Sequence, residues 1–405
     1  MTEDVPSPLK DPILGAAPEL EDFSLVLGGP IYQLWRKARL GENVDKLLMR
    51  RMLLISGITW IPLLVLCGIQ GTLLGGIEVP FLVDVETHAR FLVAVPLLVI
   101  AELVVHQRMR LIVSQFVERG LIPACSMDRF RDALRGAMAW RNSIPAELAL
   151  IAVVYTLGYY LRAKSFALET STWYALAGAD GATLTRPGLW FFWVSNPIMQ
   201  FLTLRWFYRI VIWARFLWQV ARIELDLIPT HPDRNGGLGF LGGAAFAYAP
   251  LLTAFGTSTA GLVASRIFFA GASLAAFKLE IVLLAAFGMA LVLGPLSVFG
   301  PQILAAKRKA LREYGKFAAE YSREFDRRWL RSSDRDGEAL LGSGDIQSLA
   351  DLGNAFSVIK EMKALPFSRD VFVQLILATV VPFFPLLFTM FPLEELLNRL
   401  IGAVF

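Results

Sequence analysis

The chain has 405 residues, of which 55% are hydrophobic and only 18% are charged, against roughly 25% charged in an average soluble domain. A mean hydropathy of +0.53 and a net charge of only +4 exclude a disordered chain, a nucleic-acid-binding protein and most soluble enzymes. Because the apolar runs are too long for a soluble core, the fold class expected is all-α, a polytopic membrane helix bundle with cytosolic helical extensions.

The first segment of the chain is polar. Residues 1–30 hold five prolines and six acidic residues without an apolar core, which predicts a flexible tail. Residues 31–51 are expected to form a juxtamembrane helix that leads into the membrane.

About seven runs are apolar enough to be membrane spans, since a span needs about 20 residues to cross roughly 30 Å of hydrocarbon. They are Met52–Leu74, Phe91–Val105, Ile144–Leu161, Leu189–Leu217, Leu241–Ala264, Leu279–Ala306 and Val371–Met390. We therefore expect a six-span bundle over 52–306, which includes cytosolic helices at 106–141. A cytosolic helical region at 307–370 follows, and 371–405 supplies the last span and an outer interfacial helix.

The distribution of cations predicts the orientation. Of the 39 lysines and arginines, 29 lie in the alternate segments assigned to the inside, 7 lie in those assigned to the outside, and three lie within the fourth span. Because cytoplasmic loops carry the excess of Lys and Arg, the N-terminus is expected in the cytosol and the C-terminus outside. This topology suits a bacterial inner (plasma) membrane.

The cytosolic region begins with an apolar repeat. Leu304, Leu311, Ala318 and Phe325 recur every seven residues, as at one seam position of a coiled coil. The sixth span is therefore expected to continue as one long helix, whose 304–325 seam packs within the chain, against the 106–141 helices, or against a second copy in a homo-oligomer. Further on, Asp345 is expected to open a short helix and Ser368 to cap the last span.

Several charged side chains fall within the predicted spans, where charge is costly and marks a functional site by default. The topology places Glu102, Glu147 and Arg205 at one depth near the inner boundary, with Arg209 on the same helix face as Arg205 and His106 just below. This polar layer is either a cation or proton path gated by an Arg–Glu pair, or it is structural: an ion pair, or side chains that reach out to the headgroups.

The segment Thr230–Phe240 is the most distinctive loop. Its His231, Asp233 and Arg234, with Gly236 and Gly237, allow three interpretations: a tight turn between two spans, an anion-binding nest, or a metal site that includes Glu224 and Asp226. The turn is favoured.

The loop sequence His-Pro-Asp-Arg-Asn-Gly-Gly-Leu-Gly-Phe-Leu at 231–241, together with Gly-Asp-Ile-Gln-Ser-Leu-Ala-Asp-Leu at 344–352, resembles an uncharacterised family of bacterial polytopic inner-membrane proteins. The resemblance covers most of the chain. It implies the polytopic inner-membrane fold and no particular activity.

Three functions are consistent with these features. The favoured one is a channel or secondary transporter for an ion or small solute that uses the inner polar layer. The alternatives are a membrane-anchored sensor or scaffold that acts through its cytosolic helices, and a membrane enzyme that acts on a phosphate-bearing lipid. Enzymatic activity is disfavoured and no catalytic residue is assigned. No cofactor and no nucleic acid partner is expected, and the lipid bilayer is the expected surrounding.

Overall fold

The computed structural model describes residues 23–26, 28, 44–165, 171–176, 183–331 and 344–390. In chain order, with η for short 3-10 or π-helical segments, its elements are α3 (Val44–Gln70), η1 (Phe81–Val83), α4 (Val85–His88), η2 (Ala89–Ala94), α5 (Val95–Glu118), η3 (Ala124–Ser126), α6 (Met127–Arg141), α7 (Ile144–Ser165), β1 (Ala175–Leu176), β2 (Thr183–Leu184), α8 (Arg186–Trp190), η4 (Phe191–Ser195), α9 (Asn196–Val220), α10 (Leu241–Phe246), α11 (Ala249–Ala270), η5 (Leu274–Phe277), α12 (Lys278–Leu293), η6 (Gly294–Phe299), α13 (Gly300–Phe325), η7 (Asp326–Leu330), α14 (Gly344–Lys360), α15 (Arg369–Val380) and η8 (Val381–Thr389).

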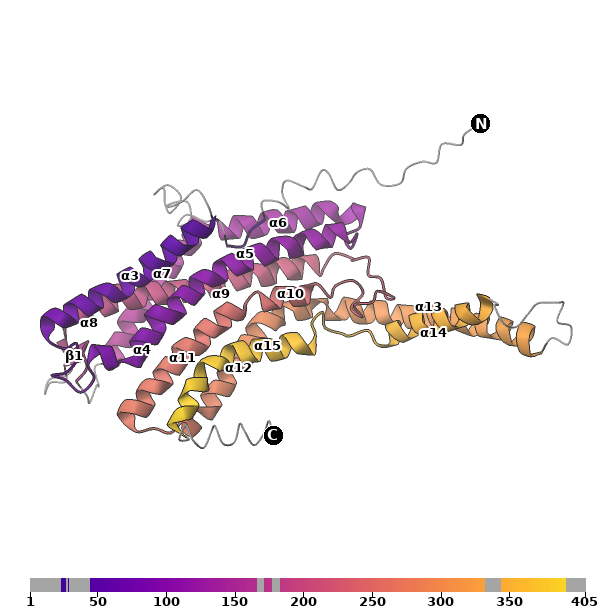
Figure 1. The fold of residues 1–405 in the computed structure, drawn as a ribbon. Helices are drawn as coiled ribbons and strands as arrows, with labels where there is room; N and C mark the ends of the chain where they lie inside the picture. The colour runs from indigo at the N-terminus through magenta and orange to yellow at the C-terminus, as the bar shows by residue number, and fades with distance from the viewer. Residues whose placement is uncertain are drawn as a thin grey trace.

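Most of these helices run side by side in one elongated bundle, and the two short strands form a small antiparallel hairpin (Figure 1). Five helical stretches are long and apolar enough to cross a membrane: Met49–Gln70, Val85–Glu118, Leu241–Ala270, Leu274–Leu330 and Arg369–Thr389. The all-α helix bundle is thus confirmed, and its apolar stretches are those of an integral membrane protein.

The two other predicted spans, α7 and α9, are also helices of the bundle, but neither is among these five stretches. The helix α9 carries three arginines, and two of them, Arg205 and Arg209, are buried against neighbouring helices. These two charges are therefore shielded by protein, as charged side chains within membrane segments usually are.

The helix α11 packs closely against its neighbours because it presents glycines to them. A Cβ at Gly256 would lie 2.2 Å from the carbonyl oxygen of Thr379 on α15, and one at Gly261 would lie 2.7 Å from Cβ of Ala89 on η2. Small residues at such positions let helix backbones approach closely, which is how membrane helices associate.

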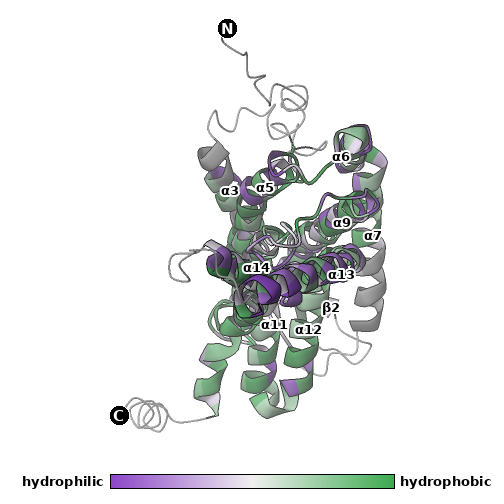
Figure 2. Cartoon of the chain, turned by 90° about the vertical axis from the view of Figure 1, so that its right-hand side faces the viewer, coloured by the Kyte–Doolittle hydropathy of each residue, from purple (hydrophilic) through white to green (hydrophobic). Residues whose placement is uncertain are grey.

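The helices α13 and α14 form a hairpin that extends beyond the bundle (Figure 1), and α13 is coloured largely hydrophilic where the helices of the bundle are mostly hydrophobic (Figure 2). The predicted seam of 304–325 packs against α14, and not against the 106–141 helices. For example, the Tyr321 hydroxyl donates to the carbonyl oxygen of Asp345 at 3.2 Å. The amphipathic face of α13 therefore has an intrachain partner.

The sixth span continues as one helical stretch over Leu274–Leu330, as predicted, but the stretch is not a regular α-helix throughout: the 3-10 segment η6 lies between α12 and α13, where Pro295 and Pro301 lack the N–H that a continuous α-helix needs. One further expectation needs correction. Within the expected flexible tail, Phe23–Val26 are buried, because their apolar side chains join the core of the bundle. Residues 31–43 and the expected outer helix after 390 lie outside the described residues. The cap of the last span is confirmed: Ser368 Oγ accepts from Val371 N at 3.3 Å.

Candidate functional site: a buried arginine–glutamate cluster

Five charged side chains from four helices meet inside the bundle. We call them the arginine–glutamate cluster, and they are Arg51 on α3, Glu102 on α5, Glu147 on α7, and Arg205 and Arg209 on α9. Each of the five residues is no more than 6% exposed. At such burial an ionised side chain is tolerated only when opposite charges surround it.

Glu102 is the centre of the cluster. Its Oε2 accepts from Nη2 of Arg51 at 2.8 Å, and its Oε1 accepts from Nη1 of Arg209 at 2.8 Å. These short distances are typical of charge-assisted hydrogen bonds. One carboxylate thus joins α3 and α9 to α5.

Arg205 is held more loosely than its neighbours. Its guanidinium nitrogens lie 3.8 Å from Oε1 of Glu102 and 3.5 Å from Oε1 of Glu147, and the guanidinium makes no hydrogen bond in the described structure. Arg51 and Arg209 take the two hydrogen-bonding positions at Glu102, so Arg205 contacts Glu102 and Glu147 only at ion-pair distances.

The sequence of α9 explains how two arginines reach one point. Arg205 and Arg209 are four residues apart, so they lie one turn apart on the same face. Trp206 lies next to them on the helix and fixes α9 against α5, since its Nε1 donates to the carbonyl oxygen of Leu98 at 3.0 Å. The guanidinium of Arg209 also lies 5.1 Å from the centroid of the Trp206 ring, a cation–π distance.

The segment Phe23–Val26 covers one side of the cluster. The carbonyl oxygen of Val26 lies 3.5 Å from Nη2 of Arg209, and the carbonyl oxygen of Ser24 accepts from Arg141 of α6. His106 of α5 contacts this segment through Nδ1, 2.8 Å from Oγ of Ser24. These contacts seat the segment on the cluster, and we call it the covering segment.

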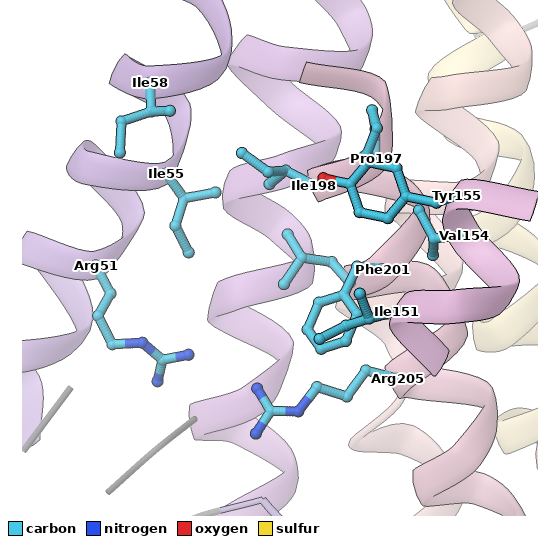
Figure 3. A pocket seen from close by; sticks show the side chains of 11 residues that line it. Arg51, Ile55, Ile58, Ile151, Val154, Tyr155, Pro197, Ile198, Phe201 and Arg205 are labelled. Carbon is cyan, nitrogen blue, oxygen red and sulfur yellow. The ribbon is translucent and has the colours of Figure 1, made fainter. Parts of the chain in front are cut away.

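Two hollows meet at Arg205. One is a groove of about 320 Å³ between α3, α7 and α9, with Arg51 and Arg205 at one end and apolar side chains beyond them (Figure 3). The other is a water-sized cavity of about 10 Å³, lined by residues that include Gly28, Arg141 and Tyr208. Arg205 therefore separates a hollow on the outside of the bundle from one beside the covering segment.

The structure brings Glu102, Glu147, Arg205 and Arg209 together, as the spacing and the cation bias suggest. His106 makes a contact with Ser24 of the covering segment. Sequence analysis missed Arg51 and Ser24. Arg51 follows Arg50 and was placed at the membrane boundary, yet it shares a face with Ile55 and Ile58 at helical spacing, and that spacing was the available signal.

The loop that contains His231 and Asp233 folds around its own carboxylate. Asp233 accepts hydrogen bonds from the N–H groups of Asn235 (2.8 Å), Gly237 (3.1 Å) and Gly239 (2.8 Å). The backbone reaches this shape through positive φ angles at Arg234, Gly236 and Gly237. The amides that resembled an anion nest thus bind the chain's own anion.

The charge of Asp233 is stabilised by these contacts. Burial alone raises its pKa, but the N–H groups of Asn235, Gly239 and Gly237 and the nearby His231 outweigh burial and hold the pKa below its ordinary value. The neighbouring Arg234 pairs with Glu361 at 2.9 Å, and its carbonyl oxygen accepts from Lys363 N at 2.8 Å. The loop therefore fastens the chain after α14 to the bundle.

Within the residues that the structure describes, no three His, Cys, Asp or Glu side chains lie close enough together to hold a metal ion. No protein-family model, curated protein or solved structure matches the chain. The fold is a membrane helix bundle, and the cluster is a buried charge network inside it. Because no related protein indicates a function, the function has to be inferred from the chemistry of this network.

Proposed function

We propose that the protein is a channel or secondary transporter for an ion or small solute, with the arginine–glutamate cluster as its selective point. The observation that carries this proposal is that four helices bring five charges into the interior of an apolar bundle, where each charge is costly unless it serves a purpose.

In this proposal the covering segment closes the cluster on its own side. It contacts Arg209 through Val26 and His106 through Ser24, so its departure would expose two polar groups of α9 and α5 to water. Arg205, which has ion pairs but no hydrogen bond, is the residue that binds the passing solute. The cation bias of the loops supports a bacterial inner membrane with this side facing the cytosol.

The experiment is a flux assay with the full chain in liposomes. Enclosed dyes report protons, potassium and chloride, and light scattering reports glycerol. We expect at least one flux above that of empty liposomes, and a fall of tenfold or more in the double variant Glu147→Gln/Arg205→Gln, which removes one ion pair without changing the net charge. Arg215→Gln is the matched control, since Arg215 lies on the same helix but stacks on Trp140 at 4.2 Å, away from the cluster.

The double variant must reach wild-type yield and unfolding temperature for the comparison to count. A wild-type protein that passes none of the four probes, or a double variant that passes them at the wild-type rate, would contradict the proposal. Equal loss in Arg215→Gln would show that any charge on α9 matters, and would contradict it as well.

A second function, a membrane-anchored scaffold, is favoured by the α13–α14 hairpin, which extends beyond the bundle (Figure 1). Phe317 on α13 is 54% exposed and Leu330 on the adjoining η7 is 74% exposed. This proposal predicts that Phe317→Asp with Leu330→Asp lowers the oligomeric state measured by light scattering in detergent. Leu311 is unsuitable for this test because it packs within the chain.

A further inference from the structure

The groove between α3, α7 and α9 has the composition of a site for an amphiphile. One wall carries Ile55 and Ile58, the opposite wall carries Ile151 and Val154, and its floor is formed by α9. Its volume of about 320 Å³ lies at the lower end of the range for small-molecule sites, roughly 300–1,000 Å³. Apart from the Tyr155 hydroxyl, the side chains of these walls are apolar, which suits a hydrocarbon chain.

The charged end of the groove is different. Of the described residues that line it, only Arg51 and Arg205 carry charge, and both are cations. Figure 3 shows their guanidinium groups pointing toward each other from the two sides of that end. Planar guanidinium groups bind the oxygens of a phosphate in pairs, which makes this end complementary to an anion.

Arg205 is the stronger indication of a ligand. It is only 6% exposed, yet its guanidinium makes no hydrogen bond in the described structure and reaches its carboxylate partners at 3.5 and 3.8 Å. A phosphate oxygen at the end of the groove would give the N–H donors of Arg205 a hydrogen-bond acceptor at shorter range than its two carboxylate contacts.

The shape of the groove selects the kind of amphiphile. From Arg51 to Ile58 there are seven residues, which is about 10 Å along the helix, so one end holds a headgroup and the rest holds part of an acyl chain. The groove is open at its side, because Ile58, Ile151 and Tyr155 are 43%, 37% and 45% exposed. One chain of a two-chain lipid can therefore enter while the second chain stays in the bilayer.

We propose that the groove between α3, α7 and α9 binds an anionic phospholipid of the surrounding membrane, with its phosphate on Arg51 and Arg205 and one acyl chain along the isoleucines. Basic pockets between membrane helices are known to bind anionic headgroups. The lipid closes the side of the cluster opposite to the covering segment. The site shares Arg205 with the proposed solute path, so a bound lipid and a passing solute would compete for this guanidinium, but lipid binding itself does not require that the protein transports a solute.

The test is lipid binding to the purified full chain in detergent, followed by native mass spectrometry. Dioleoyl phosphatidylglycerol and dioleoyl phosphatidylcholine are compared because they share both chains and differ in net charge. We expect phosphatidylglycerol to bind at least tenfold more tightly, and Arg205→Gln to lose that preference by tenfold or more. Arg215→Gln, on the same helix but outside the groove, is expected to keep it.

A second pair of variants tests the acyl chain without a change of charge. Ile151→Trp fills the groove, whereas Leu148→Trp places the same side chain on α7 at a position that is 61% exposed and outside the groove. We expect only Ile151→Trp to weaken phosphatidylglycerol binding, by about tenfold.

Equal binding of the two lipids, wild-type binding by Arg205→Gln, or equal effects of the two tryptophans would overturn the assignment. Dodecanoate serves as a single-chain probe: if it displaces phosphatidylglycerol at an equal concentration, the groove takes a free carboxylate, and the phospholipid assignment is wrong. Because binding is measured without any flux, a failure to transport leaves this result untouched.

Discussion

Arg209 on α9 and Glu102 on α5 are joined by a hydrogen bond of 2.8 Å, although 107 residues separate them in the chain. Arg51 reaches the other oxygen of the same carboxylate at the same distance. Glu102 is therefore the anion on which the packing of three helices depends. This relationship has a direct consequence for stability.

Glu102→Gln is expected to destabilise the protein strongly. The amide leaves Arg51 and Arg209 buried without their carboxylate, and breaking a buried pair by removing one partner costs about 3–5 kcal/mol. The measurement is the unfolding temperature in detergent. Glu118→Gln, at the exposed end of α5, is the control and is expected to match wild type. An unchanged unfolding temperature for Glu102→Gln would show that the cluster does not stabilise the bundle.

The covering segment gives a prediction about accessibility. Ser24 is only 4% exposed, and Phe23 packs on Phe216 with ring centroids 5.7 Å apart. In a background with Cys125→Ser, which removes the one exposed cysteine among the described residues, a Ser24→Cys variant is expected to react slowly with a water-soluble maleimide. Adding Phe23→Ala removes the aromatic anchor and is expected to increase the labelling rate by tenfold or more.

The reference for this experiment is Cys125 itself in the wild-type chain, because it is exposed. If Ser24→Cys reacts as fast as Cys125 while Phe23 is intact, the segment is not seated on the cluster in solution. The proposed closure of the cluster would then be wrong.

Much of the cluster can be predicted from the sequence. Charge inside an apolar run is rare, and the Lys and Arg bias sets the orientation of each span, which gives the relative depth of its charged residues. That argument places Glu102, Glu147 and Arg205 at one depth, and in the structure Arg205 lies within ion-pair distance of both glutamates. Depth alone does not say which side chains touch. The preference of Glu102 for Arg51 and Arg209 over Arg205 depends on helix rotation and on the packing of Trp206, which periodicity does not determine.

The parts that sequence analysis missed have a common cause. The covering segment is short, has no helical repeat and directly follows the acidic residues Glu21 and Asp22, so nothing local distinguishes Phe23 from the rest of an acidic tail. Its burial comes from tertiary contacts with α9 and with Arg141. In the same way, the heptad seam of α13 shows an apolar face but cannot name its partner, which the structure identifies as α14.

The carboxylate of Asp233 predicts a pH dependence of stability. Its pKa in the folded protein lies below its ordinary value of about 3.9, so the ionised form contributes stability above that value and the contribution is lost as the pH falls through the folded pKa. Wild type is expected to unfold at a higher temperature than Asp233→Asn at pH 6. The difference should shrink as the pH is lowered from 4.5 to 3.

Asp226→Asn serves as the control, because Asp226 lies in the same loop region but does not accept the three amide hydrogen bonds. The interpretation of the loop as a self-stabilised turn would be wrong if Asp233→Asn showed the same unfolding temperature as wild type at pH 6. It would also be wrong if the difference between the two proteins grew on acidification.

The close approach of α11 and α15 gives a last prediction, which concerns packing alone. A methyl group at Gly256 would lie 2.2 Å from the backbone oxygen of Thr379 and 3.2 Å from Cγ of Pro382, and neither a helix backbone nor a proline ring can move aside cheaply. Gly256→Ala is therefore expected to destabilise the protein by about 1–3 kcal/mol, the usual cost of overpacking. Gly243→Ala makes the same chemical change in α10, where an added Cβ meets no atom within 4 Å, and it should leave the unfolding temperature near that of wild type. If the two variants unfold at the same temperature in detergent, α11 and α15 do not pack as closely as the structure shows. The conclusion that the glycines of α11 allow close helix packing would then be wrong.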